Sequence, residues 1–364
     1  MKYKICVYAI CKNEIQFAER WYNSMKEADC VYVLDTGSTD GTAEKLTSLG
    51  ACVKQRKIDP WRFDTARNLS MDMLPYDTDI CVCTDLDEIF DKGWRNKLEN
   101  TWETTATTAS YKYIWSFDNN GNESIVFYLQ KIHSRHGFKW KYPVHEILEY
   151  FDTGKEKNIF IPNMVLKHYP DSQKSRTEYL DLLELSVKED PLNDRNMHYL
   201  GREYMFRGLW DKSIDTLKKH LSLSSATWNS ERCASMRYIA ECYVQKHDIV
   251  SAQKWLFKAI AEAPHLREPY IESAYICMLD NDWNGVVFFA EKALKIKKRE
   301  INYISDSSVW GALPYDLLSL GYYYTERYSK ALENVKTAAE LSPDDERLKQ
   351  NLKIISEKTF SHNN

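Results

Sequence analysis

Two carboxylates one residue apart form the pattern with the clearest chemistry in this chain. Asp85 and Asp87 follow the apolar residues 80–83, which are typical of a buried strand. On an extended segment, one carboxylate can bind a ribose and the other a divalent cation, because Mg²⁺ and Mn²⁺ prefer oxygen ligands and can bridge a diphosphate. A solvated turn is the alternative, but the preceding strand and a further acid at Glu88 favour the functional interpretation.

A second turn, at residues 35–42, combines two glycines with short hydroxyl side chains. These residues let the backbone pass close to a nucleotide. Asp35, at the end of an expected strand, can accept a hydrogen bond from a base. The alternative is helix capping, with Ser38 or Thr39 as the N-cap of the helix that continues through Leu46. Both interpretations can hold at once.

Alternating strands and helices must position these turns. The pattern predicts strands at residues 3–10, 29–34, 52–54 and 79–84, and helices at 17–25, 43–49 and 64–73. Such alternation is typical of a mostly parallel α/β sheet, which binds ligands at the carboxyl ends of its strands. Weaker alternation over residues 109–170 indicates an antiparallel extension that could carry contacts to an acceptor.

From Ser172 onward the hydrophobic period becomes helical and shows four units of a tetratricopeptide-like repeat. Small residues recur where paired helices would cross, and Ala259 and Ala293 lie 34 residues apart, the period of this repeat. A generic helical bundle is the alternative, but the alanines and the prolines Pro264 and Pro343 fall in phase. Repeats of this kind pair subunits or hold an extended partner.

Length and composition limit the classes of function. A chain of 364 residues predicts two domains, an α/β domain at 1–170 and an all-α repeat domain at 171–364. A net charge of −4 does not favour nucleic acid as a partner.

Because no apolar run approaches the roughly 20 residues of a membrane span and the first residues do not resemble a signal peptide, we expect a cytoplasmic protein. The nine cysteines lack Cys-x-x-Cys spacing, so neither a disulfide framework nor a zinc knuckle is indicated.

Four ordered motifs carry a resemblance to a known family. Residues 10–14, 35–42, 64–68 and 85–88 resemble, in order and approximate spacing, those of family 2 glycosyltransferases of the GT-A fold. This resemblance covers roughly residues 3–170. The Val144-His145-Glu146 and Lys167-His168-Tyr169 segments, followed by repeats, are also similar to the sublancin-type peptide S-glycosyltransferases and related phage and bacterial proteins. Those proteins join such a catalytic domain to a tetratricopeptide-like dimerisation domain.

The resemblance implies a set of residues that bind the nucleotide-sugar donor. Some would surround the uridine or support that pocket, namely Asn13, Glu14, Asp35, Ser38 and Asp40. Others would face the nucleotide, its pyrophosphate or the ribose, namely Arg67, Asn68 and Asp85.

The resemblance also implies Mn²⁺ or Mg²⁺ as cofactor and a UDP-sugar, with a hexose favoured, as donor. Asp87 would bind the metal. His168, at an expected strand end, resembles the extra metal or diphosphate ligand found in this fold. A structural histidine is the alternative for His168.

The catalytic base is less well defined by the sequence. Enzymes of this family invert the anomeric centre by direct displacement and need a group that takes the acceptor proton. The candidates are His145, Glu146 and Glu88, because the acidic pair that usually precedes a small helix in this family is not plainly present. A thiol acceptor or an acidic hydroxyl would need only a weaker base.

Two further features near these candidates could contact ligands. The basic stretch at residues 131–141 could neutralise the leaving diphosphate or contact an anionic acceptor, and a solvated β-hairpin is the alternative. Trp61 could stack on the donor or acceptor, or pack against the sheet.

The sequence favours a metal-dependent glycosyltransferase with a protein, peptide or glycan acceptor, and a homodimer formed through the repeats is possible. A transferase that acts on a modified nucleic-acid base is an alternative. A non-catalytic repeat scaffold with a vestigial nucleotide-binding domain is another, although the intact acids at 85, 87 and 88 oppose it. A nucleotidyltransferase is disfavoured because the early glycine-rich loop of that class is absent from the sequence.

Overall fold

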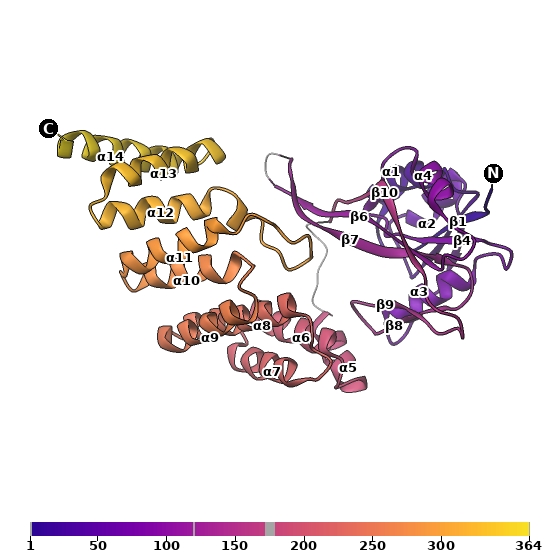
Figure 1. Cartoon of the computed structure of the whole chain (residues 1–364). Helices are drawn as coiled ribbons and strands as arrows, with labels where there is room; N and C mark the ends of the chain where they lie inside the picture. Colours follow the sequence, from indigo (N-terminus) through magenta and orange to yellow (C-terminus); the bar gives the residue numbers. More distant parts are fainter. Residues whose placement is uncertain (1, 119–120, 172–178, 364) are drawn as a thin grey trace. The chain divides into compact units, whose positions relative to one another are not determined.

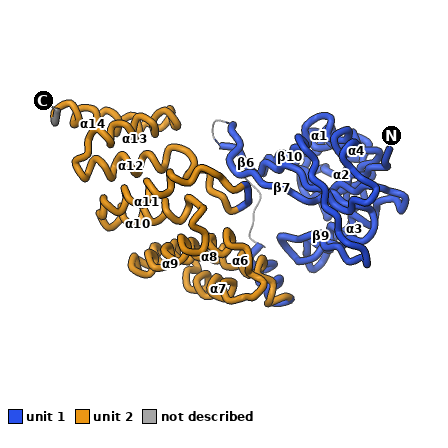
Figure 2. Tube along the Cα trace, viewed as in Figure 1, with its two compact units in different colours: residues 1–189, 301–303 blue, residues 190–300, 304–364 orange. Residues whose placement is uncertain are grey.

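The computed structural model describes residues 2–118, 121–171 and 179–363. The chain divides into two compact units, residues 1–189 with 301–303 and residues 190–300 with 304–364 (Figure 2). The expected change to a helical period at Ser172 lies outside the described residues. Each unit has its own buried core.

The first unit is built around a mixed β-sheet (Figure 1). Within the described residues the sheet has eight strands in the order β3-β2-β1-β4-β7-β6-β10-β5. Their bounds are β1 Ile5–Cys11, β2 Cys30–Asp35, β3 Cys52–Gln55, β4 Ile80–Cys83, β5 Glu88–Phe90, β6 Thr108–Phe117, β7 Glu123–Ser134 and β10 Asn158–His168. A separate hairpin pairs β8, Phe138–Lys141, with β9, Ile147–Tyr150.

The direction of the strands explains where ligands can bind. Strands β3, β2, β1 and β4 are parallel neighbours, so their carboxyl ends meet at one edge of the sheet. Strand β7 pairs antiparallel with both β4 and β6, which confirms the expected antiparallel extension. Strand β10 returns parallel to β6 and pairs antiparallel with the short β5 at the sheet's edge.

Alternating residues of the central strands pack against different layers. Ile5, Val7 and Ala9 of β1 face one core, with helices α1, α2 and α4. These helices span Ile15–Met25, Thr42–Leu49 and Trp94–Thr101. Cys6 and Tyr8 face the opposite side, where α3 and Trp140 of β8 cover the sheet. Helix α3 spans Phe63–Asp72, close to the predicted 64–73, and α5, Tyr179–Glu189, completes the described helices of this unit.

The second unit consists of helix pairs stacked in series. The pairs are α6 Asp194–Phe206 with α7 Trp210–Ser222, α8 Asn229–Gln245 with α9 Ile249–Glu262, α10 Glu268–Leu279 with α11 Trp283–Lys295, and α12 Leu313–Tyr324 with α13 Tyr328–Leu341. Helix α14, Glu346–Asn363, follows the last pair. The fold class predicted from the sequence, a mostly parallel α/β domain followed by helical repeats, is confirmed.

Small side chains let the paired helices approach each other. Ala252, Ala259, Ala293 and Ala331 are fully buried. A Cβ atom at Gly201 of α6 would lie 2.5 Å from the side chain of Leu217 in α7, so this crossing requires glycine. Over the described part of the chain, none of the helices combines the length and hydropathy that a membrane crossing requires.

Candidate active site

The acidic turn after β4 meets the end of β10. Strand β5 begins at Glu88, directly after the turn, and pairs antiparallel with β10 so that Glu88 lies opposite His168. The backbone N–H of Tyr169 donates to the carbonyl of Asp87 at 2.8 Å. This pairing places Nε2 of His168 3.3 Å from Oδ2 of Asp87, so the two predicted metal ligands lie together.

Its surroundings fix the orientation of the His168 ring. Nδ1 lies 2.9 Å from the carbonyl oxygen of Trp115, and the imidazole stacks on the Trp115 indole with ring centroids 4.2 Å apart. Burial lowers the pKa of His168, but the hydrogen bond and charge of Asp87 outweigh burial, and the net pKa is raised. With Nδ1–H donated to the carbonyl, the neutral ring presents Nε2 toward Asp87 as an available ligand atom.

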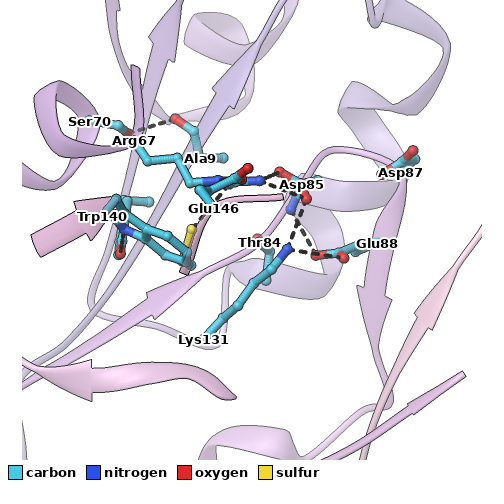
Figure 3. A network of polar contacts seen from close by, with 12 residues as sticks. Ala9, Arg67, Ser70, Thr84, Asp85, Asp87, Glu88, Lys131, Trp140 and Glu146 are labelled. Carbon is cyan, nitrogen blue, oxygen red and sulfur yellow. Dashed lines mark hydrogen bonds and ion pairs between the residues drawn. The ribbon is translucent and has the colours of Figure 1, made fainter. Parts of the chain in front are cut away.

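Asp85 accepts from two cations, the buried Arg67 and the partly buried Lys131 (Figure 3). A guanidinium nitrogen of Arg67 lies 2.9 Å from Oδ1 of Asp85, and Nζ of Lys131 lies 3.0 Å from Oδ2. Burial alone would raise the pKa of Asp85, but the charges of Arg67 and Lys131 hold it well below its usual range. The carboxylate is therefore ionised at neutral pH, and 30% of its side chain is exposed.

Arg67 joins Asp85 to Glu146, which comes from the loop before β9. Its Nε donates to Oε1 of Glu146, a second terminal nitrogen lies 3.3 Å from Sγ of Cys83, and its guanidinium carbon lies 5.2 Å from the centroid of the Trp140 ring. Arg67 is only 4% exposed. These partners hold the guanidinium in one orientation, and Figure 3 shows Arg67 with Asp85, Glu146 and Trp140.

Glu88 and Lys131 belong to the same network of polar contacts around the acidic turn. Oε2 of Glu88 accepts from the backbone N–H of Asp85 at 2.9 Å, and Oε1 accepts from the Tyr113 hydroxyl at 2.7 Å. Lys131 approaches the same carboxylate at 3.5 Å. Burial raises the pKa of Glu88, and the charges of Asp85 and Asp87 add to this effect. Glu88 is 1% exposed and holds the acidic turn in place.

The loops after β1 and β2 form one hydrogen-bonded cluster. The amide N–H of Asn13 donates to Oγ of Ser38 at 2.8 Å, and the side-chain oxygen of Asn13 accepts from the N–H of Thr39 at 2.8 Å. Oδ1 of Asp35 accepts from the N–H groups of Gly37 and Ser38, both at 2.9 Å. Because β1, β2 and β4 are parallel neighbours, this cluster lies at the same edge of the sheet as Asp85.

The helix-capping expectation for this turn needs correction. Gly41, with φ of 91°, occupies the N-cap of α2 and makes no side-chain cap bond, because it has no side chain. Asp40 instead accepts from the N–H of Thr42 at 3.0 Å and from the N–H of Ile15 at the start of α1 at 3.1 Å. Ser38 and Thr39 bond to Asn13 across the two loops, so they cap neither helix. Glu14, 6% exposed, donates its N–H to Oγ1 of Thr42 at 2.9 Å.

Two other predicted residues lie around the β8–β9 hairpin. The side-chain amide of Asn68 donates to the carbonyl of Trp140 and accepts from the backbone N–H of Trp140, each at 2.9 Å. These two hydrogen bonds fix α3 to β8. His145 has a φ of 50° and packs against the Tyr179 ring with centroids 5.8 Å apart. It is partly exposed, whereas Glu146 beside it is engaged by Arg67.

The basic stretch at 131–141 does not act as one surface. Lys131 faces the acids, whereas His133 is fully buried and lies 2.8 Å from the Tyr8 hydroxyl. Arg135 donates to the carbonyls of Leu74 and Pro75. Lys131, His133 and Arg135 therefore have different partners, and Arg135 lies beyond the end of β7, which the count of basic residues does not show. Trp61 packs edge-on against Phe63, 5.1 Å between centroids, which supports the packing interpretation.

Three residues of the network were not singled out individually from the sequence. Lys131 appeared only as one member of a basic run, and neither Tyr113 nor Trp115 of β6 was assigned a role. The sequence signal for the two aromatic residues is the period of two in β6, in which Tyr113 and Trp115 lie two residues apart near the end of the strand. Because β6 pairs parallel with β10, this end of β6 lies beside the carboxyl end of β10. No local sequence signal distinguishes Lys131 from the other basic residues of 131–141, because its contact with the acidic turn comes from the pairing of β7 with β4.

Comparisons with known proteins identify the first unit. Residues 6–159 match the model of the family described as Glycosyl transferase family 2, so this part of the chain is a family 2 glycosyltransferase domain. No curated protein matches the chain.

Solved structures, among them two described as TPR proteins, resemble part of the chain at low identity. A thermophilic TPR protein from Thermus thermophilus shows 18% identity and a TM-score of 0.35, covering 48% of this chain and 88% of that one. YrrB, another TPR protein, shows 14% identity and a TM-score of 0.37, with 48% and 81% covered. Yeast Tom70 shows 16% identity and a TM-score of 0.39, with 52% and 37% covered.

Proposed function

We propose that this protein transfers a hexose from a UDP-sugar to a protein, peptide or glycan acceptor, with inversion at the anomeric carbon. The observation that carries this proposal is the convergence of Asp85, Asp87 and His168 beside the cations Arg67 and Lys131. These groups lie in a family 2 glycosyltransferase domain. Such an arrangement offers an acidic position for a ribose hydroxyl and a metal, and positive charge for a diphosphate.

The loops after β1 and β2 are the proposed nucleotide pocket. Asn13, Ser38 and Asp40 hold the two loops together, and Asp35 anchors the second loop from the end of β2. Asp85 lies at the neighbouring strand end, where its partly exposed carboxylate can accept from the ribose. We therefore place the uridine between these loops and the ribose at Asp85.

Asp87 and His168 fit a divalent metal ion. Their ligand atoms are 3.3 Å apart, and two ligands that bind one ion at about 2.0–2.2 Å are separated by a comparable distance. The Trp115 carbonyl can only accept, so Nδ1 of His168 carries a proton and Nε2 is the ring nitrogen that the neutral side chain would offer to the ion. When bound, Mn²⁺ or Mg²⁺ supplies charge that stabilises the departing diphosphate. Arg67 and Lys131 keep Asp85 ionised, and we propose that they add positive potential to the same region.

His145 is the proposed catalytic base. Glu146 is engaged by Arg67, and Glu88 is buried beneath Tyr113 and Lys131, whereas the His145 ring is partly exposed. In the transfer step the acceptor oxygen or sulfur forms a bond to the anomeric carbon as the bond to the diphosphate breaks. The acceptor proton passes to His145, and the nucleoside diphosphate departs with the electron pair.

The helical repeats are proposed to hold the acceptor or to pair two copies of the chain. Both roles suit stacked helix pairs, which present extended surfaces. Gel filtration and cross-linking of the full chain distinguish the two roles. A monomer in solution would exclude subunit pairing and favour binding of the acceptor by the repeats.

A donor screen tests the proposed function. Thermal stability and slow donor hydrolysis are measured with UDP-, GDP-, CMP- and dTDP-sugars, with and without Mn²⁺, for the wild type and for Asp87→Ala. We expect one nucleotide class to raise the melting temperature in a Mn²⁺-dependent manner and to release free sugar in the wild type alone. The proposal is wrong if no nucleotide stabilises the wild type and no sugar is released. If Asp87→Ala hydrolysed the donor as fast as the wild type in a Mn²⁺-dependent manner, only the assignment of Asp87 as a metal ligand would be rejected.

A further inference from the structure

A buried group of metal-binding side chains lies in the second unit, where helices α6, α7 and α8 pack together. His198 comes from α6, His220 from α7 and Glu231 from the first turn of α8. The two histidines are fully buried, and Glu231 is 5% exposed. One potential ligand atom from each residue lies within 4.8 Å of the other two.

Ser235 sets which imidazole nitrogens remain available. Its hydroxyl oxygen lies 2.8 Å from Nδ1 of His198 and 2.9 Å from Nδ1 of His220. A hydroxyl oxygen has two lone pairs, so it can accept an N–H from both rings. With both protons on Nδ1, the two Nε2 atoms carry lone pairs, which is the tautomer that a metal ligand requires.

Neither Nε2 atom has a hydrogen-bond partner within the part of the chain that the structure describes. Nε2 of His220 lies 3.4 Å from Oε1 of Glu231. Two ligands of a tetrahedral ion with bonds of about 2.0–2.1 Å lie about 3.3 Å apart, so this pair already has the required separation. A buried nitrogen atom without a partner is unfavourable in a folded protein, and a bound cation would satisfy Nε2 of His198 while bridging His220 and Glu231.

Glu231 supplies the negative charge of the group. Its carboxylate would offset part of the charge of a divalent cation, whereas Arg195 and Arg202 are positive groups near His198.

We propose that His198, His220 and Glu231 bind one Zn²⁺ ion in the helical unit, with Ser235 orienting both rings. Two imidazoles and one carboxylate form a set that zinc accepts, with a fourth position left for water. Mg²⁺ and Ca²⁺ prefer sites made of oxygen ligands, so this nitrogen-rich set disfavours them. The ion joins three consecutive helices, which stabilises the beginning of the repeat stack. This site is separate from the glycosyltransferase site and does not depend on its function.

The test counts zinc in full-length protein that carries Asp87→Ala, so that the metal position of the first unit does not contribute. The metal-free protein is titrated with Zn²⁺ in competition with a chromophoric chelator. His198→Gln and Glu231→Gln are compared with His265→Gln, a control in which a half-exposed histidine of the same unit is replaced. We expect one Zn²⁺ per chain in the Asp87→Ala parent and the control. Affinity should fall about 100-fold or more in the other two variants.

A second measurement keeps the proposal testable if these variants fail to fold. One equivalent of Co²⁺ is added to the metal-free Asp87→Ala parent, and its visible absorption is recorded. Intense bands of four-coordinate Co²⁺, without a thiolate charge-transfer band, are expected from two histidines and a carboxylate. Bands that Zn²⁺ then abolishes would support the same site. Absent bands, a thiolate band, or equal zinc affinity in His198→Gln and the parent would each overturn the proposal.

Discussion

The Nε2 atom of His168 lies 3.3 Å from Oδ2 of Asp87, because the antiparallel pairing of β5 with β10 places the acidic turn beside the end of β10. This relationship requires the tertiary fold, since the two residues come from distant parts of the sequence. It also explains why β5, only three residues long, matters for the site. A change that separates β5 from β10 would separate the two proposed metal ligands.

Replacement of either proposed metal ligand should weaken metal binding. Asp87→Asn and His168→Gln each remove one ligand atom while retaining similar size, so we expect Mn²⁺ affinity to fall about 100-fold. Titration followed by the electron paramagnetic resonance signal of free Mn²⁺ measures this change. Asp91→Asn is the matched control, because Asp91 lies directly after β5 and pairs with Lys167 of β10. Unchanged Mn²⁺ affinity in both ligand variants would contradict the assignment.

The proposed base and its neighbour should differ in steady-state kinetics. His145→Asn should lower kcat about 100-fold and leave the donor KM nearly unchanged, because the base acts in the transition state. Glu146→Gln should raise the donor KM, because Arg67 loses the carboxylate that orients it. Initial rates at varied donor concentration and pH separate the two effects. A normal kcat in His145→Asn would exclude this residue as the base.

The charges of Lys131 and Glu88 should show energetic coupling in the stability of the first unit. Lys131→Met leaves the buried Glu88 without its cation, so we expect unfolding to become easier by about 3 kcal/mol. Glu88→Gln in the same chain should restore part of that loss, with a coupling energy of about 1–2 kcal/mol. Hydrogen exchange of peptides from β4 and β7 reports on this unit. Strictly additive effects of the two substitutions would show that the residues are not coupled.

The sequence predicts the elements of the first unit well because hydrophobic periods dictate them. Fully buried β1 and β4 are continuous apolar runs, and the polar turns after them mark the sheet edge where ligands are predicted to bind. The motif order also located Asp85, Asp87 and His168, which the fold brings together. The nucleotide, metal and catalytic roles of these residues stay predictions.

The partners of each side chain could not be read from the sequence. Glu146 and Arg67 are brought into contact by the packing of α3 against the β8–β9 hairpin, and no local pattern specifies that contact. Likewise, the direction in which Lys131 points depends on the register of β7 against β4. The pairing of Asn13 with Ser38 and Thr39 replaced the expected helix cap for the same reason, because the facing loop offers the closer partner.

Acid should destabilise the first unit through His133. Burial lowers the pKa of this fully buried ring to about 4, below the roughly 6.5 of an unfolded histidine. Between these pH values the unfolded chain binds the extra proton, so the stability present above pH 6.5 is lost as the pH falls. We expect a loss of about 2 kcal/mol between pH 7 and pH 5. Hydrogen exchange of β7 should show this dependence in the wild type and a flatter one in His133→Asn; equal slopes would contradict the prediction.

The helix crossing at Gly201 should tolerate no larger side chain. A Cβ atom there would lie 2.5 Å from Leu217, a fully buried residue of α7, so Gly201→Ala forces the two helices apart. We expect a loss of about 1–3 kcal/mol in the stability of the helical unit, measured by urea unfolding and by exchange of α6 and α7 peptides. Gly311→Ala is the control, because a Cβ atom there meets only ordinary contact at 3.7 Å. Adding Leu217→Ala to Gly201→Ala should cost less than the sum of the separate changes, because the truncated side chain makes room for the new methyl group. Equal stability of Gly201→Ala and Gly311→Ala would show that the helices can move apart without loss.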